Sequence, residues 1–156
     1  MLQLAGGERP PLDDSYTSQG SSMEVRIYAE DPLKDFQPSP GELTDVHWPE
    51  DDVRVDTWVE NGSEVSAHYD PMIAKLIVWD ETREQAVNRM VQALEHYRIA
   101  GLKTNIRFLH AAVDAQPFRE AELTTNFIAT HNDLLFPKSR LDLDKALVLA
   151  AGFILE

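Results

Sequence analysis

The stretch Val53-Arg54-Val55-Asp56-Thr57-Trp58-Val59 alternates between two sets of side chains. One set consists of Val53, Val55, Thr57 and Val59, and the other consists of Arg54, Asp56 and Trp58. Successive side chains of a β-strand point to opposite faces of its sheet, so this pattern predicts a strand with one buried face. The Asn61-Gly62 pair that follows tolerates positive φ and is typical of a hairpin turn. We therefore expect a strand over 53–59 that leads into a hairpin.

Three other segments carry strand patterns, at 24–29, 43–48 and 72–79. The first places Val25, Ile27 and Ala29 on one face, which predicts a half-buried strand. The second is short and follows a turn rich in proline and glycine. The third is mostly apolar and is broken by Lys75, which is typical of an interior strand.

Helical patterns follow the strands. Thr82 stands three residues before Gln85, which is the spacing of a helix-capping box. Apolar residues then recur at helical spacing as far as Tyr97, and Gly101 is expected to end this helix.

Further helices are predicted downstream. Their capping residues are expected to be Thr104 for the first, Thr124 or Thr125 for the second, and Asp142 for the third. The second is short and contains Phe127. The third covers 143–155 and is apolar almost all round, so we expect another segment or chain to bury it. Strands first and helices second predict an α+β fold, a mostly antiparallel sheet followed by packed helices.

Composition limits the possible functions. The chain has 156 residues, and 43% of them are hydrophobic, which is enough to build a core. Its 27 acidic and 14 basic residues give a net charge of −13, so we expect no nucleic-acid or membrane partner. Without cysteine there is no thiolate chemistry, and the five scattered histidines have no metal-binding spacing, so no metal site is predicted. No glycine-rich phosphate loop or nucleophile elbow is present.

Arg54 is the most informative single candidate for a functional side chain. It lies mid-strand on the face opposite Val53 and Val55, where a guanidinium offers a planar set of donors to an oxygen-rich group. From spacing alone, a cross-strand ion pair with an acidic residue is the favoured interpretation.

Other polar residues of these strands are given structural roles. Lys75 is expected to extend along the apolar surface or to reach a partner. Asp70 is expected to shape the turn before the 72–79 strand. Glu24, Arg26 and Glu30 are expected to form an ionic network.

Several motifs taken together resemble one known family. They are Glu24-Val25-Arg26-Ile27-Tyr28-Ala29-Glu30-Asp31-Pro32, Pro38-Ser39-Pro40-Gly41, Val53-Arg54-Val55-Asp56, His68-Tyr69-Asp70-Pro71-Met72-Ile73-Ala74-Lys75-Leu76-Ile77 and Gly101-Leu102-Lys103-Thr104-Asn105. In order and spacing they resemble the C-terminal domain of biotin carboxylases, over roughly residues 22–131. Each motif alone would be weak, and the set is specific.

The resemblance implies an ATP-grasp enzyme, a biotin-dependent ligase. ATP and bicarbonate give carboxyphosphate, the carboxyl group ends on N1′ of biotin, and Mg or Mn neutralises the phosphates. The arginine of the Val-Arg-Val-Asp strand, here Arg54, is implied to contact the biotin ureido oxygen. Phe127 is implied to lie near the adenine ring of ATP. Under the resemblance, the expectation for Arg54 changes from an ion pair to a catalytic contact.

The resemblance also divides the chain and implies partners. Residues 1–21 are expected to be a linker or a remnant of an upstream ATP-grasp region, 22–131 the biotin carboxylase C-terminal domain, and 132–156 the start of the segment leading to the next domain. The expected partners are that upstream domain, a downstream biotin carrier domain and a carboxyltransferase β subunit. Because the family's ATP and metal ligands lie upstream, the chain alone is expected to be inactive. We expect a cytoplasmic location in a bacterium and the mitochondrial matrix in a eukaryote.

The tail favours one member of the family. Residues 127–135 and the apolar segment after them resemble 3-methylcrotonyl-CoA carboxylase subunits. Urea carboxylase and the propionyl-CoA, geranyl-CoA and acetyl-CoA carboxylases are alternatives. A non-catalytic interaction domain with the same fold is the rival class, and the full gene, with or without upstream ATP-grasp and downstream Ala-Met-Lys-Met sequences, would separate the two.

Overall fold

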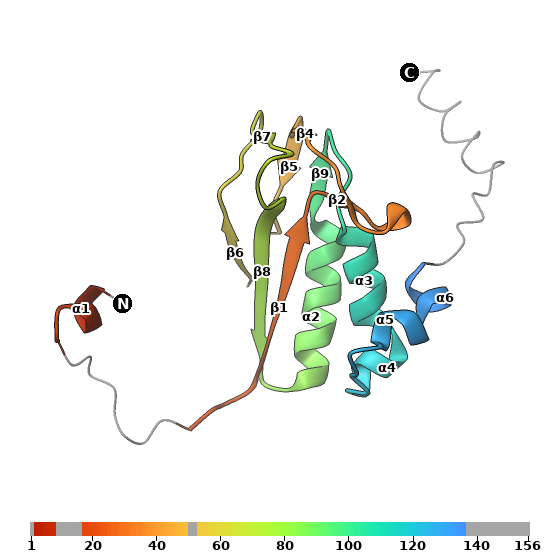
Figure 1. Ribbon diagram of the computed structural model, residues 1–156. Coiled ribbons are helices and arrows are strands. Elements are labelled where there is room, and N and C mark those ends of the chain that lie inside the picture. The colour runs from red at the N-terminus through yellow and green to blue at the C-terminus, as the bar shows by residue number, and fades with distance from the viewer. Residues whose placement is uncertain (1, 9–16, 50–52, 137–156) are drawn as a thin grey trace, which may run out of the picture.

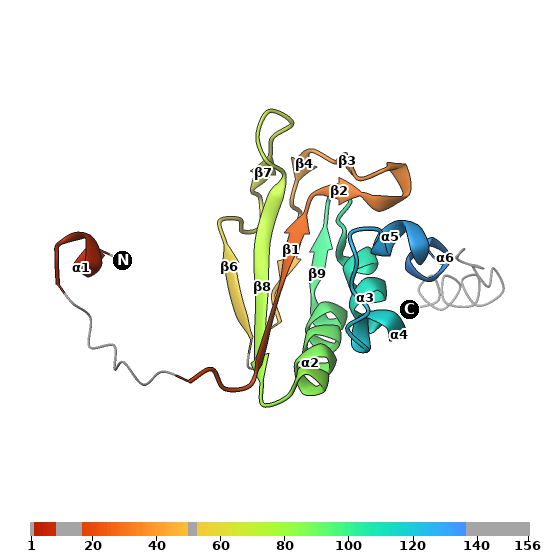
Figure 2. The same cartoon turned by 60° about the horizontal axis from the view of Figure 1, so that its bottom comes forward.

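The computed structural model describes residues 2–8, 17–49 and 53–136 (Figure 1). Its centre is a three-stranded antiparallel sheet in the order β1-β8-β6, formed by Ser21–Tyr28, Met72–Asp80 and Arg54–Thr57. Helix α2, Arg83–His96, packs along one face of this sheet, and α3, Ile106–Asp114, packs against α2 (Figures 1 and 2). The expected α+β class, with antiparallel strands followed by packed helices, is confirmed.

Short elements complete the described ranges. Two-stranded antiparallel pairs form between β2 and β3, β4 and β7, and β5 and β9. The strands are β2 (Glu30–Asp31), β3 (Gln37–Pro38), β4 (Gly41–Glu42), β5 (Asp45–His47), β7 (Glu64–Val65) and β9 (Arg98–Ala100). The helices are α1 (Leu2–Ala5), the 3-10 turn η1 (Pro32–Lys34), α4 (Gln116–Arg119), α5 (Phe127–Thr130) and α6 (Asn132–Leu135). None of the helices in these ranges is long and apolar enough to cross a membrane.

The core lies between the central sheet and α2. Alternation along β1 buries Val25 and Ile27, and alternation along β8 buries Leu76 and Val78. The buried face of α2 consists of Ala86, Val87, Met90, Ala93 and Leu94. Each fully buried side chain of this size contributes about 1.5–3 kcal/mol, so this seam fixes which face of the sheet turns outward.

A β-bulge changes the alternation near the start of β8. Ile27 pairs with Ala74 and Tyr28 pairs with Met72, so Ile73 is the extra residue. Ile73 and Ala74 are both buried although they are neighbours in sequence, because a bulge directs two consecutive side chains to one side.

The start of α2 agrees with the sequence and its end does not. Thr82 Oγ1 accepts a hydrogen bond from the Gln85 backbone N–H, so the predicted cap is confirmed. The helix ends at His96, and the next residues form β9, which pairs with β5. Gly101 therefore ends a strand and not the helix, with φ of 107°.

The chain turns after β6, but the hairpin predicted there does not form. Gly62 has φ of 85°, but Asn61 does not have the positive φ that a two-residue Asn-Gly hairpin turn requires at both positions. Instead, β6 pairs with β8 while β7 pairs with β4. The turn is fastened elsewhere, since Asn61 Oδ1 accepts from the Val46 backbone N–H at 2.7 Å and the Gly62 N–H donates to the Leu43 carbonyl oxygen at 2.7 Å.

Asn105, and not Thr104, precedes α3 as its cap residue, and it makes no side-chain cap bond. Its side chain points to β1 instead. Oδ1 accepts from the Tyr28 backbone N–H at 2.9 Å, and Nδ2 donates to the Arg26 carbonyl oxygen at 3.1 Å. Asn105 is only 5% exposed, so it joins the start of α3 to the end of β1 inside the protein.

The short helix predicted around Phe127 is α5. Its cap residue is Asn126, so neither Thr124 nor Thr125 caps it; Thr124 contributes a carbonyl oxygen that accepts from the Phe127 N–H. The helix predicted over 143–155 lies outside the described residues.

Candidate functional site

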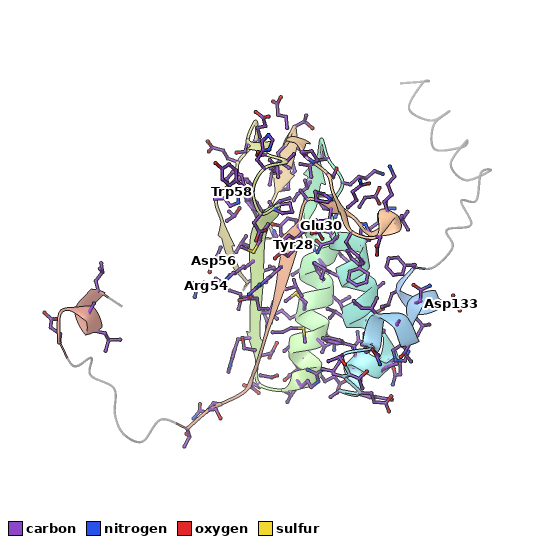
Figure 3. All side chains as sticks on the ribbon, viewed as in Figure 1. Tyr28, Glu30, Arg54, Asp56, Trp58 and Asp133 are labelled. Carbon is purple, nitrogen blue, oxygen red and sulfur yellow. The ribbon has the colours of Figure 1, made fainter. Side chains whose placement is uncertain are left out.

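The face of the central sheet opposite α2 is polar, and we call it the outer face. It carries Glu24 and Arg26 on β1, Lys75 on β8, and Arg54 and Asp56 on β6. Register arranges them in two rows, because Arg54 and Glu24 both pair with Ile77 while Asp56 and Arg26 both pair with Lys75. Figure 3 shows Arg54 and Asp56 extending from β6, one of the two edge strands of this sheet.

Arg54 and Asp56 form a bidentate pair along β6. Arg54 Nε donates to Asp56 Oδ1 at 2.9 Å, and Arg54 Nη2 donates to Asp56 Oδ2 at 2.8 Å. The cross-strand ion pair expected from spacing alone is therefore replaced by a pair within one strand. Residues two apart on a strand share a face, which makes this geometry possible.

The pair affects the charge state of both groups. The hydrogen bonds from Arg54, helped by the positive charges of Arg54 and Lys75, hold the pKa of Asp56 below its usual range. Asp56 in turn raises the pKa of Arg54. Both groups are consequently charged at neutral pH.

Arg54 keeps donors for a ligand. A guanidinium has five N–H donors, and Asp56 takes two of them, which leaves three. These three bond to no other residue within the described ranges. The Arg54 side chain is 72% exposed and lines an open hollow of about 590 Å³. The other residues that line this hollow are Val53, Ile77, Val78 and Trp79 at the sheet and Arg89 on α2. A planar oxygen-rich group could therefore reach the guanidinium directly.

The ionic network expected around the first strand is only partly present. Arg26 Nε contacts Glu24 Oε1 at 3.4 Å. Within the described ranges, Glu30 and Arg26 form no ion pair. Burial raises the pKa of Glu30, and the nearby Asp70 carboxylate adds to that rise. Asp70 shapes its turn as predicted, since Oδ1 accepts from the Met72 backbone N–H at 2.9 Å.

Trp58 was overlooked as a candidate from the sequence. Its indole N–H donates to the Met72 carbonyl oxygen at 2.8 Å, which fixes the ring while 60% of the residue stays exposed. Trp58 follows Asp56 by two residues and lies close beyond the end of β6 (Figure 3). The available signal was a large aromatic residue at a polar position of an alternating strand.

Phe127 lies far from Arg54. It begins α5, and its ring contacts Phe118 and His131 at centroid distances of 6.2 and 4.8 Å. Both views place β6 and α5 on opposite sides of the domain (Figures 1 and 2). The structure therefore does not bring the two predicted site residues together. No cluster of three or more His, Asp or Glu side chains suited to a metal ion occurs in the described part.

Comparison with known proteins identifies the family. The model of the biotin carboxylase C-terminal domain matches residues 24–130, which is more than half of the chain. The chain belongs to the biotin carboxylase C-terminal domain family. The match includes all five charged residues of the outer face, which lie on the three strands β1, β8 and β6, and it also includes Phe127.

Relatives and solved structures agree with this assignment. The chain is 42% identical over 132 residues to urea amidolyase of Saccharomyces cerevisiae, covering 84% of the chain and 7% of that protein. It is 41% identical over 157 residues to the mitochondrial methylcrotonoyl-CoA carboxylase subunit alpha of Dictyostelium discoideum, covering 99% of the chain and 22% of that protein. The biotin carboxylase domain of a thermophilic 2-oxoglutarate carboxylase bound to bicarbonate superposes with a TM-score of 0.82 at 38% identity, covering 86% of the chain and 31% of that structure. The chain thus spans less than a third of each of these proteins.

Proposed function

We propose that this chain is the C-terminal part of the biotin carboxylase component of an acyl-CoA carboxylase, and that its outer face receives biotin. The observation that carries the proposal is Arg54, whose guanidinium is fixed by Asp56 on an open face and has three donors that bond to no other described residue. In the intact subunit, biotin, ATP and Mg or Mn would be the cofactors. The ATP and metal ligands would come from an upstream ATP-grasp domain.

The proposed chemistry at Arg54 is charge stabilisation. When N1′ of biotin loses its proton, negative charge spreads to the ureido oxygen. A guanidinium donor directed at that oxygen stabilises the charge as it develops, as an oxyanion-hole donor does. Asp56 raises the pKa of Arg54, so the guanidinium stays cationic throughout the reaction. Arg54 therefore acts as an electrostatic group and not as a proton donor.

For the final acceptor we favour 3-methylcrotonyl-CoA. The support is the reach of the similarity, since the methylcrotonoyl-CoA carboxylase relative is aligned over 99% of the chain and urea amidolyase over 84%. The chain is 42% identical to urea amidolyase and 41% identical to the methylcrotonoyl-CoA carboxylase subunit, so urea carboxylase is the second candidate. A carboxyltransferase β subunit and a downstream biotin carrier domain would be the partners. Assaying the full-length subunit with its partner on 3-methylcrotonyl-CoA and on urea distinguishes the two acceptors.

The same proposal assigns Phe127 to the binding of ATP. As an aromatic side chain at the start of α5, it would contact the adenine ring once the upstream domain closes the ATP site. Phe127→Ala in the full-length subunit should then raise the KM for ATP and leave the KM for biotin unchanged.

The experiment that tests the proposal compares two rates in the full-length subunit. Arg54→Ala and Arg54→Lys should slow carboxylation of biotin by about 100-fold, the effect of losing one oxyanion donor. Biotin-independent, bicarbonate-dependent ATP cleavage should fall much less, because carboxyphosphate forms without biotin. Equal losses in both rates, or no loss in either, would return Arg54 to the role of a surface ion pair.

A further inference from the structure

Asp56 engages Arg54 with both of its carboxylate oxygens. The distances are 2.9 Å from Nε and 2.8 Å from Nη2, so two parallel hydrogen bonds define the plane of the guanidinium. We propose that Asp56 is a positioning residue that fixes the direction of the Arg54 guanidinium, so that its three remaining donors face the ligand. This inference rests on the proposed function of Arg54.

The pair contributes little to the fold. The side chains of Arg54 and Asp56 are 72% and 43% exposed. Exposed ion pairs contribute little to stability, because solvent and salt screen them and ordering the side chains costs entropy. A residue kept for stability alone would therefore gain little from this geometry, whereas orientation needs no large free energy.

Opposite charges two residues apart on a strand of this face do not always form such a bidentate pair. Glu24 and Arg26 have the same spacing on β1 and the same face, yet they make a single contact of 3.4 Å. Asp56 also has Lys75 directly opposite it on β8. Within the described ranges Lys75 forms no ion pair or hydrogen bond with Asp56, and both carboxylate oxygens are turned toward Arg54.

Positioning has a kinetic signature that differs from simple attraction. The Asp56 carboxylate offsets part of the positive charge of Arg54, so it does not strengthen the attraction of the site for an anionic or carbonyl oxygen. Its removal should therefore leave ground-state binding of biotin almost unchanged. It should lower turnover, because a donor that is free to rotate is poorly aligned with the oxygen in the transition state.

The test uses the full-length carboxylase subunit and measures kcat and KM for free biotin. Asp56→Asn keeps the size of the side chain but can accept only through one oxygen, so kcat should fall about tenfold with little change in KM. Asp56→Glu restores a two-oxygen acceptor and should recover part of that loss. Asp114→Asn is the matched control, because Asp114 Oδ1 accepts two hydrogen bonds from Arg119 at 2.7 and 3.2 Å, and it belongs to α3 and not to the outer face. The control should keep the wild-type kcat.

The double variant decides whether Asp56 acts through Arg54. If it does, Asp56→Asn should cause no further loss of kcat in an Arg54→Ala background. Additive losses, or a wild-type kcat for Asp56→Asn in an enzyme that Arg54→Ala impairs, would overturn the positioning role and leave the proposed function standing. No effect of Arg54→Ala itself would refute the proposed function instead. Thermal melting of every variant identifies a loss that comes from misfolding.

Discussion

Asn105→Ala should be one of the most destabilising single changes in this domain that leaves the apolar core intact. The Asn105 side chain makes two hydrogen bonds to β1, one in each direction, at a position that is 5% exposed. Alanine removes both bonds. The Tyr28 N–H and the Arg26 carbonyl oxygen would then lose their partner in a partly buried place, at the end of β1.

The magnitude follows from these two groups. A buried polar group that loses its partner costs about 1–3 kcal/mol, so two such groups give a loss of about 2–4 kcal/mol once some entry of water into the vacated space is allowed. A domain of this size has about 5–15 kcal/mol of total stability, so the loss is a large share of it. Asn105→Asp should be less harmful at low pH, because a protonated carboxyl group both accepts and donates.

The assay is equilibrium unfolding of the chain in urea, followed by circular dichroism. Asn88→Ala is the matched control, because exposed Asn88 on α2 accepts only a surface hydrogen bond from Arg119, at 2.7 Å. The control should change stability by less than about 0.5 kcal/mol, as surface substitutions do. A loss for Asn105→Ala as small as that of Asn88→Ala would show that the joint between α3 and β1 does not stabilise the fold.

Three other changes have defined outcomes. Gly101→Ala should lower the melting temperature, because a Cβ there would overlap the Glu42 carbonyl oxygen and φ is 107°; an unchanged melting temperature would contradict the close approach of these two segments. Within the described ranges the buried Tyr97 hydroxyl has no hydrogen-bond partner, and burial raises the pKa of Tyr97. The contribution of Tyr97 to stability is therefore fully present below about pH 10 and is lost as the pH rises further, so Tyr97→Phe should be neutral or stabilising at pH 7 and should remove that loss in urea unfolding. The isolated 156-residue chain should show no bicarbonate-dependent ATP cleavage above a blank, and measurable turnover would place ATP-binding groups within it.

Local patterns predicted the strands and the faces they bury, because alternation is a property of each segment alone. The pattern over 53–59 placed Arg54 and Asp56 on one face, and the structure agrees. That same alternation makes residues two apart neighbours, so the ion pair within β6 was predictable. A cross-strand partner was predicted instead, but the residue opposite Arg54 on β8 is Ile77 and not an acid.

Pairing between distant segments could not be predicted in this way. The Asn61-Gly62 turn has the chemistry of a hairpin, yet β8 lies beside β6 because its apolar residues fill the space over α2. Strand β9 is only three residues long and was assigned to the preceding helix. Residues 98–100 form a strand because they pair with β5, which lies about fifty residues earlier in the chain. Thr104 was likewise predicted to cap the helix over 106–114, whereas Asn105 holds the cap position and its side chain bonds to β1.

Arg54 and Asp56 can have two roles on β6, protection of an edge strand and contact with the ligand, and an experiment can separate these roles. As an edge strand, β6 has a neighbour on only one side within the described part, and charged side chains on such a strand discourage pairing with other chains. That protection depends on charge and not on shape, so lysine provides it as well as arginine. Contact with a ureido oxygen depends on shape, because the lysine ammonium is a point charge that Asp56 cannot hold by two parallel bonds. Arg54→Lys should therefore remain as soluble as the wild type and still lose turnover of biotin, whereas a purely protective role would leave both unchanged.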